Sequence, residues 1–525
     1  MSFTVRRVRE DEQPSALRKS VRFGLGLVTS SRQLWHHFQE RKEADQERQS
    51  REHTLKRTVT ILLSVLLSVL LLAGALNILL RLKSFATDLF SVAGATLPKD
   101  EDGFTNVLLL GVGDNDHDGV DLTDTIMVAS IDAVRTKSVV LLSIPRDTYI
   151  LSSEKMAKGR INSLYRDYKN YLIHRGTEKK AASLEALRQL GEEISTFIGL
   201  PIHGVVKINF SGFIQGVDAL GGIDIAVPED IVDPEYPGPD YSYETFRISK
   251  GPQHMSGAIA LRYVRTRHTT SDFSRSARQQ QVIAAIGRQA KSAGLLSRPA
   301  TLTGLFGIVA DNVETTFGVR ELISLAQTGK ALDPRRVISV QLSDQSGLTG
   351  GIPQIGGFLY PPPREQFDGA SVLLPLSIPE FPVTWNQVRA FGSILFRHRS
   401  LFLDPPHFVV VNAGAKPGSA FRLAGELTRF GFPVVKTGNL EKKNNPSLPA
   451  SSIVFNPLFD QPEHEKAKER VLEEAAFLSE LLGIPLVSST DPRPFADGDG
   501  DIGVILGKDF TFAPLQDRLA EVADR

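Results

Sequence analysis

The feature that most constrains this chain is a stretch of 23 consecutive residues, 58–80, that carries no charge and is rich in leucine. At about 1.5 Å per residue, a helix of this length crosses a hydrocarbon layer of about 30 Å. The stretch starts too late and runs too long for a cleaved signal peptide. A helix buried in a soluble core is the alternative, but such helices rarely stay apolar on every face for so long. We therefore expect a membrane-spanning helix at residues 58–80.

The charges that flank this helix predict its orientation. Residues 1–57 hold 13 lysines and arginines against 8 acidic residues, whereas only Arg81 and Lys83 follow the helix closely. Loops rich in lysine and arginine stay on the cytoplasmic side of a membrane. We expect a single-pass type II protein of the cell membrane, with a cytoplasmic region at 1–57, a stalk at 81–103 and an extracytoplasmic part beyond it.

Charge and cysteine content exclude several classes of protein. The 60 basic residues balance the 60 acidic residues, so the chain lacks the cation excess with which nucleic-acid binders neutralise phosphates. It has no cysteine, which excludes disulfides, thiolate zinc sites and thiol catalysis. We expect no nucleic-acid partner, and any site for an anion must be local.

Beyond the stalk, apolar runs of strand length alternate with helical patterns, which predicts a membrane-anchored α/β sandwich at residues 104–376. A linker at 377–406, with two prolines near its end, separates it from a second, smaller α/β domain at 407–511, and a tail at 512–525 follows. In the first domain we expect strands at residues 106–110, 125–131, 138–144, 204–209, 223–227 and 336–342 and helices at 183–198, 213–220, 257–266, 278–291 and 319–328. In the second we expect strands at 408–411, 433–435, 452–455 and 502–506 and helices at 419–430 and 465–482.

Two carboxylates lie at neighbouring strand ends. Asp114 follows the first extracytoplasmic strand, and Asp124 opens the next one. Such a pair can share a hard cation, and Mg²⁺ usually takes one or two protein carboxylates together with phosphate oxygens. Asp116, Asp118 and Asp121 in the same loop are alternative ligands, and aspartate at a strand end is otherwise a turn or cap residue.

Arginines gather in two places. Arg146 and Asp147 follow the third strand, and residues 262–278 hold five arginines and only one aspartate. A salt-bridged surface is the ordinary explanation for such a segment, but it has too few acids to balance its arginines. Guanidinium groups are the planar, bidentate partners of phosphate oxygens. A cation held by carboxylates opposite several arginines is what a pyrophosphate site requires.

Seven motifs in this order resemble the LytR-CpsA-Psr family over about residues 104–376. They are Asn-Val-Leu-Leu-Leu-Gly ending at Gly111, Thr-Asp-Thr at 123–125, Ser-Ile-Pro-Arg-Asp-Thr-Tyr ending at Tyr149, Arg-Ile-Asn ending at Asn162, Ala-Leu-Gly-Gly-Ile-Asp ending at Asp224, Arg-Thr-Arg at 265–267 and Asp-Phe-Ser-Arg-Ser-Ala-Arg-Gln-Gln ending at Gln280. The second domain is similar to the LytR carboxy-terminal domain.

The resemblance implies a Mg²⁺-dependent phosphotransferase that moves a glycopolymer from a polyprenyl-pyrophosphate carrier to a cell-wall or envelope acceptor. By position, it implies Asp114 and Asp124 as the Mg²⁺ ligands. It implies pyrophosphate binding by Arg146, Arg160, Arg265, Arg267, Arg275 and Gln279. It implies catalytic roles for Arg146, Asp147, Arg265, Arg267 and Asp272, with Asp272 orienting the arginines.

The chain departs from the family pattern in three places. The first loop reads Val112-Gly-Asp114 where the family usually has Gly-x-Asp. Arg160 stands where the family often has lysine, which keeps the charge and changes the geometry. The second domain reads Asn412-Ala-Gly414 where the family usually has Asn-Gly.

Other readings stay open. The base that accepts the acceptor's proton is Asp124, Asp147 or Asp272. A non-catalytic envelope scaffold or a polyprenyl-lipid-binding protein is the alternative function, although neither needs a metal site opposite several arginines. A transcriptional attenuator would need contact with DNA, yet the arginine motifs follow the predicted membrane helix and the net charge is zero.

Overall fold

A computed structural model describes residues 97–525 with gaps, and all of them belong to one compact unit, 54–525. The predicted cytoplasmic region, membrane helix and most of the stalk lie outside the described residues. Among the helices that are described, none is both long and apolar enough to cross a membrane. Within 97–525 the description omits residues 115–118, 239–241, 267–271, 293–310, 319–320, 322–323, 326–327, 329–330, 334–335, 348–350, 377–382, 441–447, 461–464, 488–492, 496–499 and 524–525.

A six-stranded mixed sheet forms the centre of the first domain, with strand order β11-β6-β1-β2-β3-β12. Strands β1, β2 and β3 form an antiparallel meander, and β6 and β12 add to it in parallel on either side. The bounds are β1 Thr105–Val112, β2 Thr123–Asp132, β3 Ser138–Ser143, β6 Gly204–Asn209, β11 Val313–Thr315 and β12 Val337–Gln341.

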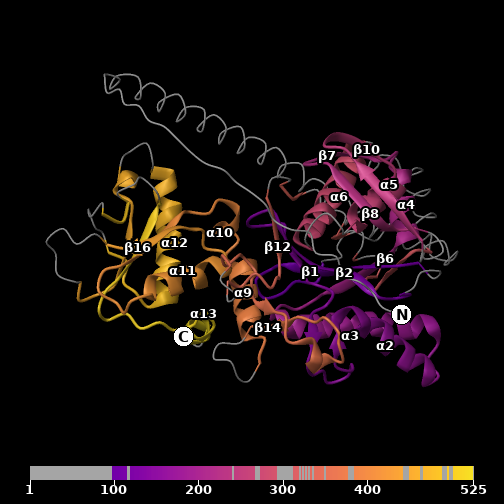
Figure 1. The fold of residues 1–525 in the computed structure, drawn as a ribbon, viewed down its shortest axis with the longest axis horizontal. Helices are drawn as coiled ribbons and strands as arrows, with labels where there is room; N and C mark the ends of the chain where they lie inside the picture. Colours follow the sequence, from indigo (N-terminus) through magenta and orange to yellow (C-terminus); the bar gives the residue numbers. More distant parts are fainter. Residues whose placement is uncertain are drawn as a thin grey trace, which may run out of the picture. The chain divides into compact units, whose positions relative to one another are not determined.

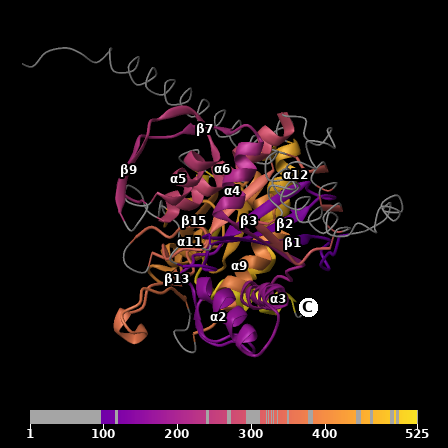
Figure 2. The same ribbon diagram turned by 90° about the vertical axis from the view of Figure 1, so that its right-hand side faces the viewer.

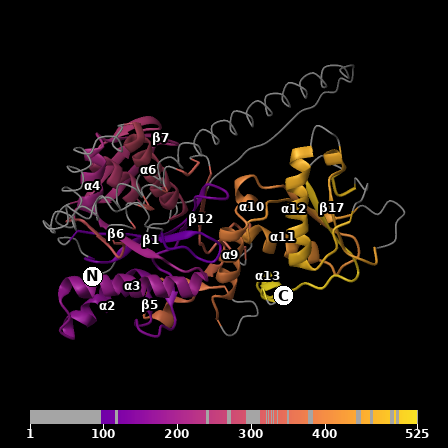
Figure 3. The same cartoon turned by 180° about the vertical axis from the view of Figure 1, so that it is seen from behind.

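Both faces of this sheet are buried, which explains the unbroken apolar runs in its strands. Along β1, Leu108 and Leu110 join the core on one face, and Val107 joins the core on the other. Helices α2 (Ile161–His174) and α3 (Lys179–Ile198) cover the first face, as Figures 1 and 3 show.

The other side of the sheet carries three helices with their own apolar cluster (Figure 2). Local capping sets where two of them begin: Asn209 accepts a hydrogen bond from Gly212 N at 2.8 Å for α4, and Ser256 accepts one from Ile259 N for α5. The elements are α4 Phe210–Ala219, β7 Ile223–Val227, β8 Ile231–Pro237, β9 Tyr243–Ile248, β10 Gly251–Met255, α5 Gly257–Arg265 and α6 Asp272–Ser292.

The second domain is a four-stranded sheet with order β16-β15-β18-β17. Strand β15 pairs in parallel with β16 and β18, and β17 is antiparallel to β18. Its elements are β15 Phe408–Asn412, α11 Ser419–Arg429, β16 Val434–Asn439, β17 Ser452–Phe455, α12 Glu465–Leu482, β18 Ile502–Leu506 and α13 Leu515–Ala523. Short elements elsewhere are β4 Tyr149–Ile150, β5 Gly159–Arg160, β13 Leu359–Tyr360, β14 Leu374–Pro375, η4 Arg364–Phe367, η5 Pro457–Asp460 and η7 Arg493–Phe495.

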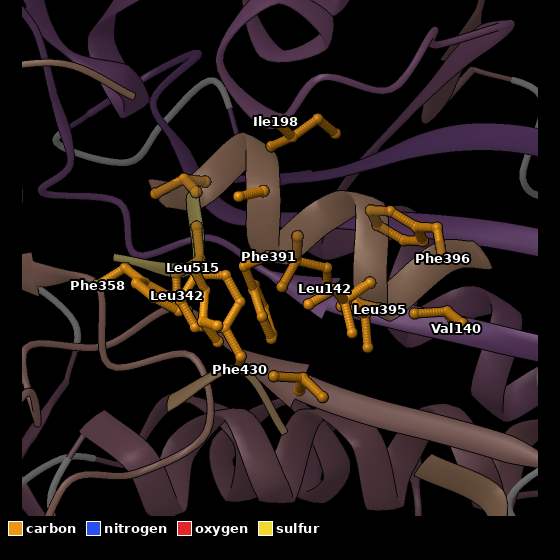
Figure 4. Packing of buried hydrophobic residues seen from close by; sticks show 14 of the residues in the cluster. Val140, Leu142, Ile198, Leu342, Phe358, Phe391, Leu395, Phe396, Phe430 and Leu515 are labelled. Atoms are coloured by element: carbon orange, nitrogen blue, oxygen red, sulfur yellow. The ribbon is translucent and has the colours of Figure 1, made fainter. Parts of the chain in front are cut away.

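The range expected to be a linker contains two helices, α9 (Asn386–Arg397) and α10 (Ser400–Leu403). Phe391 and Leu395 of α9 lie at helical spacing and are fully buried in the same cluster as Leu142 of β3 and Phe430 (Figure 4). Gly392 permits this packing, since a Cβ there would lie 2.5 Å from the Ile198 carbonyl oxygen. The expected tail likewise contains α13, whose Leu515 is buried in this cluster.

A buried arginine joins α10 to the sheet. Arg399 is 1% exposed, and its guanidinium lies 4.0 Å from the centre of the Phe104 ring. It donates to the Ser130 carbonyl at 3.2 Å and hydroxyl at 2.7 Å, and to the Ser138 carbonyl at 3.3 Å. Burial lowers the pKa of Arg399 to about 10. The Arg399 guanidinium is therefore bound by oxygens at the end of the sheet where β2 ends and β3 begins.

Replacing Arg399 with methionine is expected to lower the free energy of unfolding by about 3 kcal/mol, because buried oxygens on Ser130 and Ser138 lose their donors. Arg397→Met is the matched control, since Arg397 forms an exposed ion pair with Asp102 at 2.8 Å, and its loss should cost less than ~1 kcal/mol. Chemical denaturation of the two variants measures the difference. Equal stabilities would show that the buried contacts of Arg399 contribute nothing.

Candidate active site

A cavity opens at one end of the sheet, where β2 begins and β3 ends. The antiparallel register pairs Met127 with Ser143, so Asp124 lies beside the segment that continues from β3 through Arg146. Helix α6 adds two side chains from the other side of the sheet. The cavity is lined by Asp124, Thr125, Ile126, Ser143, Ile144, Pro145, Arg146, Asp147, Arg275, Gln279, Gln341 and Leu373.

Arg146 connects the two carboxylates of the cavity. Its Nη1 lies 3.1 Å from Asp124 Oδ1, and its Nε lies 3.7 Å from Asp147 Oδ2. Arg160, on β5, reaches Asp147 Oδ1 at 3.4 Å because β5 pairs with β4, which follows Asp147 closely. Four predicted residues from three separate motifs therefore share one chain of charged contacts.

Arg275 and Gln279 lie one turn apart on α6, so they share a face of the helix. Gln279 Nε2 donates to Thr125 Oγ1 at 3.2 Å, which joins α6 to the start of β2. Arg275 and Arg146 are half-buried and line the same cavity as Asp124. Two guanidinium groups that line one cavity suit an anion with several oxygens.

The polar atoms of the cavity are not all satisfied by the protein. Ser143 Oγ and Gln341 Oε1 are buried and have no hydrogen-bond partner among the described residues. Asp124 uses its Oδ1 to accept from Arg146 and from Asn162 Nδ2, the latter at 3.3 Å. Buried polar atoms without protein partners indicate solvent or a polar ligand.

Asp114 and Arg265 lie near the start of α4 instead of lining the cavity. Asp114 accepts hydrogen bonds from Ser211 N at 3.0 Å and from Ser211 Oγ at 2.8 Å. The Arg265 guanidinium lies 4.5 Å from the centre of the ring of Phe210, the first residue of α4. Arg267 lies outside the described residues, and so does the side chain of Asp272 at the start of α6.

Asp121, one of the alternative metal ligands, forms ion pairs with two lysines. Its carboxylate lies 2.6 Å from Lys169 Nζ and 3.5 Å from Lys207 Nζ. Lys207 also reaches Glu314 at 2.9 Å and the Tyr165 hydroxyl at 2.7 Å. Burial alone would raise the pKa of Asp121, but the two ammonium groups hold it below its usual value. Asp116 and Asp118 lie outside the described residues.

The low pKa of Asp121 predicts a pH dependence of stability. Asp121 contributes stability above its unfolded pKa of about 3.9, and this contribution is lost as the pH falls through its lower folded pKa. Asp121→Asn should cost about 3 kcal/mol at pH 7, because Lys169 and Lys207 lose a buried partner. Denaturation at a series of pH values should show this deficit shrink toward pH 3. Glu192→Gln, in an exposed pair with Lys155, should cost less than ~1 kcal/mol.

The residues suit a metal ion bound by Asp124 alone better than one shared by Asp114 and Asp124. Both oxygens of Asp114 accept hydrogen bonds from Ser211, whereas Asp124 Oδ2 has no donor in the described part of the chain. No group of three or more histidine, cysteine, aspartate or glutamate side chains suited to a metal occurs among the described residues. One carboxylate completed by ligand oxygens is a set that Mg²⁺ accepts.

Asn162 is a site residue that was not predicted from the sequence: it is buried and donates to Asp124. Thr123 Oγ1 in turn donates to the Asn162 carbonyl at 3.3 Å. The sequence did carry one signal for this role: Asn162 belongs to the same motif as Arg160, which lies two residues earlier. Since β5 leads directly into α2, the first turn of that helix places Asn162 beside Asp124.

Two family models match the chain. The LytR-CpsA-Psr model matches residues 83–357, which is more than half of the chain. The chain belongs to the LytR-CpsA-Psr family. A second model, described as LytR cell envelope-related transcriptional attenuator, matches residues 408–510 of this family member.

Several relatives are similar to this member of the family. It is 26% identical to the cell wall biosynthesis protein LcpA of Corynebacterium glutamicum, covering 77% of this chain and 74% of LcpA. It is 29% identical to the polyisoprenyl-teichoic acid–peptidoglycan teichoic acid transferase TagU of Oceanobacillus iheyensis, covering 44% of this chain and 63% of TagU, less than two thirds of that relative's length. The crystal structure of Bacillus subtilis TagV matches with 22% identity and a TM-score of 0.39, covering 57% of this chain and 98% of TagV.

Proposed function

We propose that this protein transfers a glycopolymer phosphate from a polyprenyl-pyrophosphate carrier to a hydroxyl of a cell-wall or envelope acceptor. The observation that carries the proposal is the cavity lined by Asp124, Arg146 and Arg275. Family membership and the names of the relatives LcpA and TagU support it.

The residues of the cavity have distinct tasks in this reaction. Arg146, Arg275 and Gln279 bind the pyrophosphate oxygens. Arg265, which is not among the lining residues, and Arg267, which lies outside the described residues, contribute two further guanidinium groups in this proposal. Asp124 would hold a Mg²⁺ ion, which would supply neutralisation of the pyrophosphate charge. Positioning and charge stabilisation by the arginines then account for most of the rate.

The reaction exchanges one phosphorus–oxygen bond for another. The acceptor oxygen forms a bond to the sugar-side phosphorus, and the bond from that phosphorus to the bridging oxygen breaks. The electron pair leaves with the lipid phosphate, and Asp124, Asp147 or Asp272 takes the acceptor's proton. Arg146 and Arg160 hold both oxygens of Asp147, so they also orient this candidate base.

A lipid carrier places the reaction at a membrane surface, so we also propose that residues 58–80 anchor the protein there. The excess of lysine and arginine before residue 58 orients the catalytic domain outside the cytoplasm. Protease added to spheroplasts should digest the domains after residue 81 and spare residues 1–57. Protection of those domains would reverse the orientation.

The function is tested with the full chain in detergent, a polyprenyl-pyrophosphate-linked oligosaccharide and a peptidoglycan acceptor. We expect covalent transfer that stops when EDTA removes the metal and resumes when Mg²⁺ is added. Native mass spectrometry of the purified protein should show a bound polyprenyl phosphate. Lipid binding without transfer to any acceptor would instead favour a lipid-binding scaffold.

A further inference from the structure

Thr266 separates the two arginines of the Arg-Thr-Arg motif and is fully buried. It is the residue that ends α5, and its backbone turns from helical to extended with φ −59° and ψ 139°. Arg265 precedes this turn and Arg267 follows it. The orientation of the peptide group between Arg265 and Thr266 therefore sets the direction in which Arg265 leaves the chain.

Two buried charged side chains hold Thr266 from different elements. The Thr266 hydroxyl donates to Asp233 Oδ2 on β8. Arg278 on α6 donates from Nη2 to the Thr266 carbonyl at 2.7 Å. Asp233 is 0% exposed and Arg278 is 4% exposed. Hydrogen bonds to ionised groups are stronger than neutral ones, and burial removes the competition from water.

The geometry of these bonds is specific to the arginine motif. The carbonyl that Arg278 holds belongs to the peptide group that joins Thr266 to Arg267. The hydroxyl that Asp233 holds fixes the side chain between the two arginines. The Arg265 guanidinium lies over the Phe210 ring. The hydrogen bonds of Thr266 fix the backbone directly after Arg265.

Helix α6 links this arrangement to the cavity. Arg278 is adjacent to Gln279 and one turn from Arg275, and both of those line the cavity with Asp124. Helix α6 thus carries the proposed pyrophosphate ligands Arg275 and Gln279 on its cavity face. Through Arg278 it also holds Thr266 of the Arg-Thr-Arg motif. Sites built on rigid elements with a supporting shell of hydrogen bonds hold their geometry best.

We propose that Asp233 and Arg278 are positioning residues that act through Thr266 to hold Arg265 in the geometry of a pyrophosphate clamp. The inference rests on the proposed function. A merely structural role for the same contacts would affect stability alone. A positioning role also affects the rate of transfer, because small errors in the placement of charge-stabilising groups are costly in phosphoryl transfer.

The test compares three variants of the full chain. Thr266→Val keeps the side-chain volume and the carbonyl but removes the hydroxyl, and Thr266→Ser restores it. Thr105→Val is the matched control, since Thr105 is also buried and donates its hydroxyl to the Pro98 carbonyl at 2.9 Å, before the first strand. We expect kcat for transfer to fall at least about 30-fold in Thr266→Val and about threefold or less in Thr266→Ser. Thr105→Val should melt as early as Thr266→Val and transfer normally.

If Thr266→Val does not fold, Asp233→Asn tests the same positioning role. Asp233→Asn keeps the shape and an acceptor oxygen but loses the charge, and we expect a loss of about tenfold in kcat. Normal transfer by the folded Thr266 and Asp233 variants, beside a large loss in Arg265→Lys, would overturn the positioning role and leave the proposed function intact. Absence of transfer and of farnesyl pyrophosphate binding by the wild-type protein would overturn both.

Discussion

Replacing Asp124 with alanine is expected to abolish glycopolymer transfer, with a loss of about 100-fold or more in kcat. The substitution removes Asp124 Oδ2, a carboxylate oxygen of the cavity that has no donor in the described part of the chain. It also removes the partner that holds Arg146 Nη1 at 3.1 Å, so the guanidinium loses its orientation toward the pyrophosphate. The Asp124 side chain is 41% exposed, so the fold should remain intact.

Transfer kinetics and thermal melting on the same preparations measure this effect. Asp167→Ala is the control, because Asp167 lies on the exposed side of α2 in an ion pair with Arg166 at 2.7 Å. It should retain wild-type activity. In Asp124→Ala, raising the Mg²⁺ concentration should restore little of the rate, since the arginine contact is lost as well. Full activity in Asp124→Ala would remove this residue from the site.

The second large effect is expected from Arg267→Lys and Arg265→Lys, which keep the charge and change only its shape. Exposed ion pairs are worth less than ~1 kcal/mol, so lysine could replace a surface arginine almost freely. A pyrophosphate ligand uses the planar fork of arginine, and the loss of one donor to developing charge costs about 100-fold in rate. We therefore expect near-normal melting with a loss of that size in transfer and weaker polyprenyl-pyrophosphate binding.

Arg262→Lys provides the comparison on the same helix. Arg262 pairs with Glu244 at 2.7 Å, and its guanidinium lies 4.9 Å from the centre of the Tyr236 ring, so its task is to pack β8 and β9 against α5. We expect a small change in stability and wild-type transfer. Normal kinetics in both Arg265→Lys and Arg267→Lys would mean that these arginines are surface charges, and would favour the scaffold.

The sequence was sufficient for most of the regular elements of the two domains. Strands at 204–209, 223–227, 452–455 and 502–506 and the helix at 465–482 have the predicted bounds. These segments carry complete local signals, because a strand buried on both faces is an apolar run, and an amphipathic helix repeats its apolar residues. The strand at 223–227 has one exposed face, and its buried residues alternate with exposed ones. The hairpin of β8 and β9 was missed, since its short strands carry several prolines and charges.

The linker shows where local patterns mislead. Prolines near residue 405 suggested an extended connection, yet α9 has an apolar stripe of ordinary helical spacing just before them. Its burial depends on partners contributed by β3, α3 and α11, which no local pattern identifies. The buried cation of Arg399 is equally non-local, because its acceptors lie about 260 residues earlier in the chain.

The same distinction between local patterns and non-local contacts applies to the candidate site. The sequence by itself determined which residue types occur and in what order, and those motifs identified the family. Only the tertiary structure decided which of them meet: Thr125 and Gln279 are 154 positions apart and share a hydrogen bond, while Asp114 caps α4 and Asp121 binds two lysines. The physical reason is that hydrophobic periodicity and capping act over a few residues, whereas the convergence of side chains depends on sheet register and helix packing between distant segments.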